Sequence, residues 1–165
     1  MAAGHDVPAV NDRFEKYWSI LDHESLAGSE VDSRARALVD REPDLEPGLE
    51  FSDGPPVTLW LKDQDRLRFL LHIQANSPCF EGHFPGNPIL PGIIQLHWAV
   101  LLARHCLGLK EPPKELRRIK FHGILVPPRL VELRLRAQNE RSVEFQVLGR
   151  SEAHSSGLLV FPERM

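Results

Sequence analysis

The stretch of sequence that decides the fold is FEGHFPGNPILPGIIQLHWAV, residues 80–100. Its first half surrounds His83 with proline and glycine, which oppose helix formation, and its second half is almost continuously apolar. Between Pro91 and Leu107 apolar side chains occupy nearly every angle of a helix. A helix that is apolar on all sides is normally buried on all sides. We therefore expect a loop that leads into one long buried helix near residues 91–107.

Pro91 and Gly92 stand where that helix should begin. Proline is tolerated in a first helical turn because the N–H group that it lacks would have no acceptor there. Glycine lets a ligand approach the backbone closely. The first amides of a helix point outward with the positive end of the helix dipole behind them, which suits an oxyanion or a polarised carbonyl. We expect His83 nearby, and an imidazole beside such amides predicts an acid–base site.

The remainder of residues 55–165 has the pattern of β-strands. LVELRLRAQ, residues 130–138, alternates between apolar and polar residues, and SVEFQVLG, residues 142–149, repeats the alternation. Shorter strand-like runs are VTLWLK (57–62), RLRFLLHIQ (66–74) and GLLVF (157–161). One long helix among several strands predicts an α+β domain in which an antiparallel sheet curls around the helix.

Residues 1–54 differ in composition from residues 55–165. They contain thirteen Asp or Glu against five Lys or Arg, a formal charge of −8, which leaves +5 on the other residues. Residues 31–41 predict a helix, and a Pro- and Gly-rich acidic stretch after it indicates a linker. Residues 11–26 predict an amphipathic helix whose apolar face carries Phe14, Tyr17, Trp18 and Leu21. We expect an acidic helical extension and linker at 1–54 and the main domain at 55–165.

Several classes of protein are disfavoured. Cys79 and Cys106 make no disulfide framework, and His105 beside Cys106 lacks a third metal ligand at a recognisable spacing. The start of the chain has no secretory signal pattern, and the longest apolar run, 93–109, is interrupted by Gln, His and Arg. No GxSxG elbow and no phosphate-binding glycine loop occur. We expect a cytoplasmic protein without a membrane span, metal or cofactor.

GHFPGNPILPG, residues 82–92, closely resembles the signature of 3-hydroxyacyl-(acyl-carrier-protein) dehydratases of the hotdog fold. The continuation GIIQLHWAV, residues 92–100, most resembles the branch of that family associated with aryl polyene lipid biosynthesis. IKFHGILVPPRLVELRL, residues 119–135, is similar to the family's strand, proline-containing turn and strand. The resemblance covers roughly residues 57–161. It implies the α+β hotdog fold, an antiparallel sheet wrapped around one long central helix.

The resemblance also implies the roles of three residues in the dehydration of a 3-hydroxyacyl thioester to a trans-2-enoyl thioester. The histidine of GHFP removes a proton from C2 of the acyl chain, which assigns that role to His83. The glycine of the PG pair offers its amide to the thioester carbonyl, which assigns Gly92. An acidic residue from the other subunit of a dimer helps the 3-hydroxyl leave, but this chain has His97 at that position, fourteen residues after His83. An imidazolium can donate a proton near neutrality, so we expect His97 to replace the acid.

The same resemblance gives the chain two partners, an acyl carrier protein and a second copy of itself. Residues expected to line the substrate are Phe84, Pro91, Ile93 and Trp98. Carrier proteins are strongly acidic, and the expected docking residues are Arg117, Arg118, Lys120 and Arg129, with Arg134 and Arg136 in the same basic cluster. An ordinary solvated face is the alternative for this cluster, whereas nucleic-acid binding is disfavoured because aromatic residues are not interleaved. We expect a homodimer or a higher oligomer, because a single curled sheet leaves an edge strand to pair.

Three functions remain open from the sequence. The first is the dehydratase, a lyase of lipid metabolism. The second is an acyl-thioester-binding partner subunit with weak or no catalysis, because His97 replaces a carboxylate. The third is a hotdog thioesterase, because one fold hosts several chemistries.

The extension also has two interpretations. In the first, it is a helical flap that buries its aromatic face on the hotdog surface or on the partner subunit. In the second, it is an acidic screen held by its tether near the basic docking residues.

Overall fold

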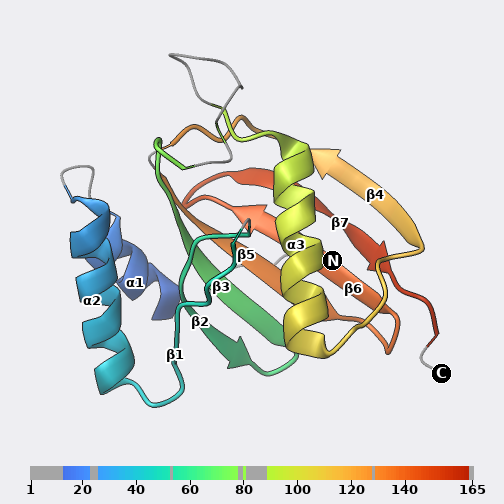
Figure 1. Ribbon diagram of the computed structural model, residues 1–165, viewed down its shortest axis with the longest axis horizontal. Helices are drawn as coiled ribbons and strands as arrows, with labels where there is room; N and C mark the ends of the chain where they lie inside the picture. Colours follow the sequence, from blue (N-terminus) through green and yellow to red (C-terminus); the bar gives the residue numbers. More distant parts are fainter. Residues whose placement is uncertain are drawn as a thin grey trace.

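The computed structural model describes residues 13–22, 26–52, 54–77, 80, 89–127 and 129–163. In this part of the chain, seven antiparallel strands form one sheet that curls around a long helix, α3, from Gly92 to Leu107 (Figure 1). The order of the strands is β1-β2-β3-β5-β6-β7-β4. Their bounds are β1 Glu46–Pro47, β2 Val57–Asp63, β3 Arg66–Ile73, β4 Glu115–Phe121, β5 Arg129–Ala137, β6 Ser142–Leu148 and β7 Ala153–Val160. This is the hotdog fold predicted from the sequence.

Pro91 and Gly108 define the two ends of helix α3. Pro91 is the N-cap residue with extended backbone angles (φ −62°, ψ 146°), so the helix begins at Gly92, one residue later than expected. Gly108 ends it in the left-handed conformation (φ 65°), which favours glycine, and its N–H donates to the carbonyl of Arg104. Arg104 and His105 lie in the last turn, where cationic groups interact favourably with the helix dipole.

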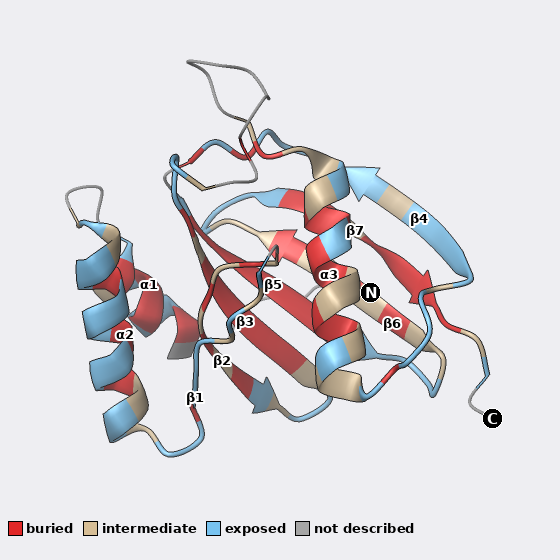
Figure 2. Cartoon of the chain, viewed as in Figure 1, coloured by how far each residue is buried: buried red, intermediate tan, exposed pale blue. Residues whose placement is uncertain are grey.

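The sheet covers only one side of α3. The buried residues of the helix are Gln95, Leu96, Trp98, Ala99, Leu102 and Ala103. Ile93, His97 and His105 are exposed and lie on the flank of α3 that does not pack on the sheet. Figure 2 shows exposed stretches along α3. The prediction that the helix is buried all round is therefore wrong for the single protomer, because one curled sheet cannot surround a helix. The apolar part of this flank is available to another chain.

Strands β2, β3 and β5 are buried on both faces. Along β3, Phe69, Leu71 and Ile73 face α3 and belong to the main core, whereas Leu70 belongs to a second core on the outer face. An irregularity between Val57 and Leu59 changes the face that β2 presents, so that Val57 packs in the main core and Leu59 packs in the outer one.

The N-terminal helices, α1 (Arg13–Leu21) and α2 (Gly28–Arg41), cover the outer core. These two helices lie at the side of the sheet where β1 and β2 form one edge (Figure 1). The predicted aromatic face is buried there against the sheet, with its members Phe14, Tyr17, Trp18 and Leu21 each no more than 5% exposed. The flap interpretation of the extension therefore holds for α1 and α2, which pack on the hotdog surface of their own protomer.

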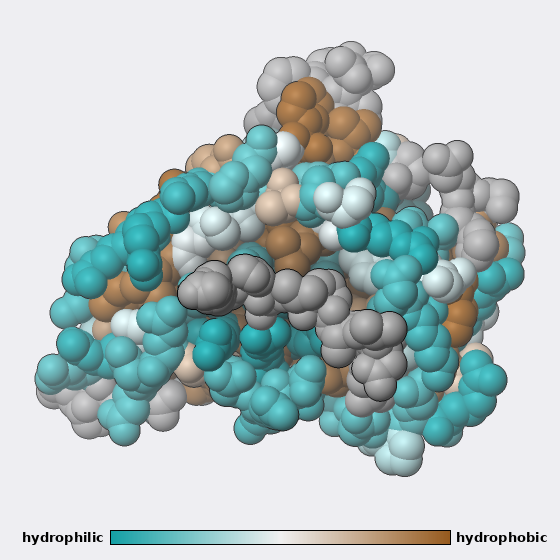
Figure 3. Space-filling model, turned by 180° about the vertical axis from the view of Figure 1, so that it is seen from behind, coloured by the Kyte–Doolittle hydropathy of each residue, from teal (hydrophilic) through white to brown (hydrophobic). Residues whose placement is uncertain are grey.

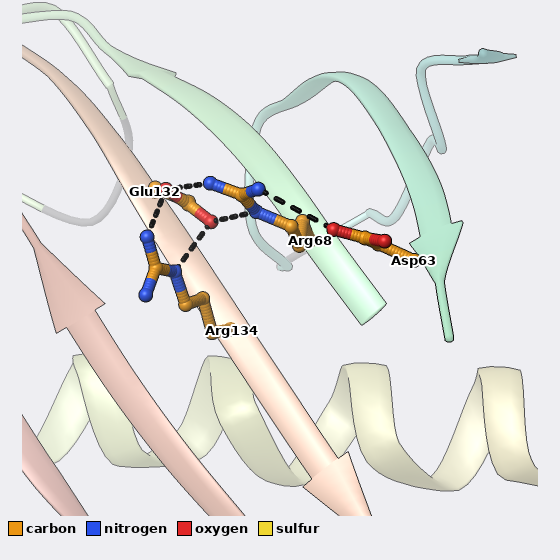
Figure 4. A network of polar contacts seen from close by, with 4 residues as sticks. All are labelled: Asp63, Arg68, Glu132 and Arg134. Carbon is orange, nitrogen blue, oxygen red and sulfur yellow. Dashed lines mark hydrogen bonds and ion pairs between the residues drawn. The ribbon is translucent and has the colours of Figure 1, made fainter. Parts of the chain in front are cut away.

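A buried ionic network joins β3 and β5 (Figure 4), on the outer face of the sheet where Phe14 of α1 packs. Glu132 of β5 accepts hydrogen bonds from Nε of Arg68 at 2.6 Å and from Nε of Arg134 at 2.7 Å. The three residues are 2%, 4% and 9% exposed, in the order Glu132, Arg68 and Arg134. The Arg68 guanidinium also lies 4.1 Å from the ring centre of Phe14, which belongs to α1. Arg134 is thus not part of a basic surface, because α1 covers the outer face of β5.

The molecular surface is otherwise mainly polar. Seen from behind, on the side away from α3, it is largely hydrophilic (Figure 3). Among the described helices, none has the length and apolar character needed to cross a bilayer. Large apolar side chains that are nevertheless exposed are Ile93, Leu116, Phe121, Ile124 and Val126.

We predict that Glu132→Gln lowers the free energy of unfolding by about 3–5 kcal/mol, because it leaves two buried guanidinium groups without their shared carboxylate. Urea denaturation followed by circular dichroism measures the change. Asp65→Asn is the matched control, since it removes the exposed pair of Asp65 with Arg136 (3.0 Å) and should change stability little. Equal effects of the two substitutions would contradict a structural role of the buried network.

Candidate functional site

The first turn of α3 presents backbone amides that no helical carbonyl accepts. The amides of Ile94 and Gln95 donate to the carbonyl of Pro91, at 3.1 and 3.3 Å. Helix geometry leaves the preceding amides, those of Gly92 and Ile93, without an intrahelical acceptor. Gly92 is half-buried and Ile93 is 64% exposed, so these amides lie at the edge of the core rather than inside it. This end of α3 can therefore polarise a carbonyl or hold an anion.

Phe121, the last residue of β4, lies against Gly92. A Cβ atom built on Gly92 would overlap the Phe121 ring, so a larger residue at this position would require the ring to shift. The ring is 55% exposed, and Ile124, 68% exposed, lies in the loop that follows β4. The same loop is tied to the start of α3, because the amide of Leu90 donates to the carbonyl of Leu125 at 2.8 Å. An apolar rim therefore borders the amides, as a binding site for an acyl group requires.

Sequence reasoning missed Phe121. Its signal was an aromatic residue at the end of an otherwise polar strand, directly before His122 and Gly123. Nothing in that pattern shows that the ring packs on Gly92, because the contact joins segments that are distant in the sequence.

The predicted residues fall into separate groups. Pro91, Gly92 and Ile93 lie together at the start of α3, and His97 is exposed one turn further along the same flank. Trp98, expected to line the substrate, is 3% exposed and packs in the main core. His83 and Phe84 lie outside the described residues, so their positions relative to Gly92 are not part of this geometry.

The basic residues are exposed, but several have acidic neighbours. Arg117 pairs with Glu115, whose pKa it lowers, and Nη1 of Arg129 lies 2.7 Å from Oε1 of Glu152. Arg117, Arg118 and Lys120 belong to β4, at the edge of the sheet opposite to β1. Helices α1 and α2 lie at the β1 side (Figure 1), so these two helices do not screen the basic residues of β4 in the protomer.

The far end of α3 carries His105 and Cys106, the pair considered above as metal ligands. Burial raises the pKa of the Cys106 thiol to about 11, so this side chain stays protonated at neutral pH. The ring of His105, its neighbour, makes an edge-on contact with Phe51. Within the described segments, no group of three or more His, Cys, Asp or Glu side chains could hold a metal ion.

The curled sheet and its central helix define a hotdog protein, and comparison with known sequences identifies the family. The sequence model of the ApeI-like family, described as ApeI dehydratase, matches residues 60–158. This match spans more than half of the chain, so the chain belongs to the ApeI-like dehydratase family. The family resemblance predicted from the GHFPGNPILPG stretch is thereby confirmed.

Two curated relatives carry the name 3-hydroxyacyl-(acyl-carrier-protein) dehydratase. That of Alkaliphilus metalliredigens is 37% identical over 71 residues, which are 39% of this chain and 48% of the relative. That of Chloroflexus aggregans is 41% identical over 87 residues, 53% of this chain and 49% of the relative. The chain thus spans about half the length of the curated relatives it matches.

Solved structures confirm the fold. The dehydratase heterocomplex ApeI:P from Xenorhabdus doucetiae contains a chain that is 23% identical, with a TM-score of 0.54 over 59% of this chain and 88% of that chain. A protein from Erwinia carotovora subsp. atroseptica is 28% identical, with a TM-score of 0.51 over 61% of this chain and 87% of that chain.

The contact between Phe121 and Gly92 leads us to predict how substitutions at the two positions together change stability. Gly92→Ala should destabilise the protein by about 1 kcal/mol, because the new methyl group overpacks against the ring. In a Phe121→Ala background the same change should be neutral or slightly stabilising, since alanine forms helices better than glycine. Thermal denaturation of the four proteins measures the coupling. The same loss in both backgrounds would show that the ring does not restrict this position.

Proposed function

We propose that the chain catalyses the dehydration of 3-hydroxyacyl thioesters, carried on an acyl carrier protein, to trans-2-enoyl thioesters. The observation that carries the proposal is the first turn of α3, where the Gly92 amide, which has no intrahelical acceptor, adjoins an apolar rim that includes Phe121. The names of the curated relatives support the same reaction and the same carrier.

The proposal assigns a residue of this chain to each step of the reaction. His83 removes a proton from C2, and the negative charge that develops on the thioester oxygen is stabilised by the Gly92 amide. The C3–O bond then breaks, and the hydroxyl leaves as water with a proton from an imidazolium at His97. No cofactor is required, because the proton taken from C2 and the proton given to the hydroxyl balance.

His97 acts in the site of a second subunit. It is exposed and is not among the residues of α3 that are buried against the sheet of its own protomer. Strand β4 ends the sheet and pairs only with β7 among the described strands, so its outer edge has free backbone groups. Exposed Leu116 and Phe121 on this strand add apolar surface. A second copy paired along β4 would cover this surface and bring His97 toward its partner's site.

Carrier docking is assigned to Arg117, Arg118, Lys120 and Arg129. All four are exposed, and an acidic carrier protein would be steered to them electrostatically. Arg134 is excluded from this surface because it is buried with Glu132.

A second candidate function is an acyl-binding partner subunit with weak or no catalysis. Two observations favour it. Helix α3 contains no Asp or Glu, so no carboxylate of this helix replaces the one that His97 displaces. The dehydratase from Xenorhabdus doucetiae, a fold neighbour, is a heterocomplex.

The decisive experiment incubates the purified protein with 3-hydroxyacyl and 2-enoyl thioesters and follows the gain or loss of one water by mass spectrometry. His83→Ala should abolish turnover, and His97→Gln should lower it by about a hundredfold or more, because each removes a proton-transfer group. His105→Ala is the control, an exposed histidine two turns beyond His97.

The outcomes separate the candidates. Turnover that survives His83→Ala would overturn the assignment of the base. Acyl binding without turnover, together with activity gained on His97→Glu, would establish the partner-subunit function. Release of free acid and thiol would instead identify a thioesterase.

The proposed dimer can be tested by substitutions in the interface. Leu116→Glu combined with Ile124→Glu should convert a dimer to a monomer at micromolar concentration, because both place charge on exposed apolar positions at the β4 side. Sedimentation velocity measures the mass. Ala137→Glu, an exposed position at the end of β5, is the control. A monomeric unmutated protein would refute pairing through β4.

A further inference from the structure

Gln95 is a polar residue on the buried side of α3. It is 2% exposed, and its neighbours on this side of the helix are apolar. The hydroxyl of Ser155, a fully buried residue of β7, donates a hydrogen bond to Oε1 of Gln95 at 2.7 Å. Nε2 of Gln95 in turn donates to the backbone carbonyl of Leu90 at 3.4 Å. These two bonds explain how the core tolerates an amide group, since a buried amide without partners is costly.

Leu90, the residue before Pro91, is held at both of its backbone polar groups. Its N–H donates to the carbonyl of Leu125 at 2.8 Å, and its carbonyl accepts from Gln95. The backbone that leads into Gly92 is therefore fixed on one side to the loop after β4. On the other side it is fixed to β7 through Gln95 and Ser155.

We propose that Gln95 and Ser155 are positioning residues that hold the Gly92 amide where it polarises the thioester carbonyl. This inference rests on the proposed function and adds two residues to it, neither of which touches the reacting atoms. The effect passes through the backbone from Leu90 to Gly92. Displacing a catalytic group by about 1 Å can lower a rate about a hundredfold, so a bond that fixes this backbone has a measurable consequence.

The neighbouring serine of β7 provides a matched control. Ser155 faces α3, whereas Ser156 faces the opposite side of the strand, with its Oγ 3.4 Å from Nε2 of His122. Ser155→Ala and Ser156→Ala therefore remove the same hydroxyl group from adjacent positions. Only the Ser155 hydroxyl is linked, through Gln95, to the backbone at the start of α3.

The experiment uses hexanoyl-pantetheine labelled with ¹³C at the thioester carbonyl. This saturated acyl chain cannot be dehydrated or hydrated, so the measurement does not depend on turnover. Isotope-edited infrared difference spectra report the carbonyl stretch, which moves to lower frequency when an amide polarises the carbonyl. The proteins compared are the unmutated chain, Ser155→Ala, Ser155→Thr, Ser156→Ala and the double variant Gln95→Leu with Ser155→Ala. The double variant removes both buried polar groups together, which protects folding.

We expect the low-frequency shift to shrink in Ser155→Ala and in the double variant, and to persist in Ser156→Ala and in Ser155→Thr, which keeps the hydroxyl. With a 3-hydroxyacyl substrate, kcat should fall about tenfold to a hundredfold in the same two variants, with little change in KM. An unchanged carbonyl shift in the double variant would overturn the positioning role even if the unmutated protein turns over substrate. A shift that depends on Ser155 in a protein without turnover would support positioning and refute the dehydratase proposal. If the labelled thioester binds without any shift, or does not bind at all, the positioning inference is wrong.

Discussion

The packing of α3 against one curled sheet is the constraint on which the rest of the structure depends. The helix is apolar around most of its circumference, but the sheet covers only the side that carries Trp98, Ala99 and Leu102. The uncovered flank begins with Ile93, and the β4 edge adds Leu116 and Phe121. A monomer therefore leaves apolar surface beside an edge of β4 that pairs with no other described strand, and the second chain proposed above would cover both. The candidate site lies at the boundary between the covered and uncovered sides of α3, where a substrate can reach the first amides of the helix without unfolding the core.

The opposite face of the sheet is covered in a different way. Helices α1 and α2 cover much of the outer side of β2, β3 and β5, so the exposed residues of these strands lie near their ends. Two arginines and one glutamate are buried there, and the Coulomb attraction within this group has to offset the loss of hydration of each charge. The bidentate contacts of Arg68 and Arg134 with Glu132, and the Phe14 ring over Arg68, supply the partners that make such burial tolerable. The acidic composition of residues 1–54 is thus compatible with a role in folding, because the surface of α1 that packs on the sheet is aromatic.

Periodicity and turn chemistry predicted the fold well, and long-range contacts explain what they missed. The alternation in residues 130–138 placed β5 correctly, and Pro91 with Gly92 placed the start of α3 to within one residue. The same alternation suggested that Arg134 faces solvent, which is wrong because α1, more than a hundred residues earlier in the chain, covers that face. The beginning of β7 was also missed, because Ala153–Ser156 lacks the apolar residues that mark strands. In the sequence Gln95 is only an interruption of an apolar run. Its role as a hydrogen-bond acceptor could not be predicted, because its partner Ser155 lies sixty residues away.

The replacement of a carboxylate by His97 that the family resemblance implies would affect assembly and chemistry differently. A carboxylate on the exposed flank of α3 would carry a negative charge into a subunit interface, where it needs a hydrogen-bond or cationic partner. A neutral imidazole beside Ile93 imposes a smaller desolvation cost and can pack on apolar surface with its ring carbon atoms. The interface proposed for β4 and α3 is thus easier to form with His97 than with Glu or Asp. Proton donation, in contrast, requires the imidazolium, whose charge has to be balanced by the developing charge on the leaving hydroxyl. The proposed dimer interface and the proposed lyase chemistry would therefore favour opposite charge states of one side chain, and for this reason substitution of His97 distinguishes a catalytic subunit from a binding one.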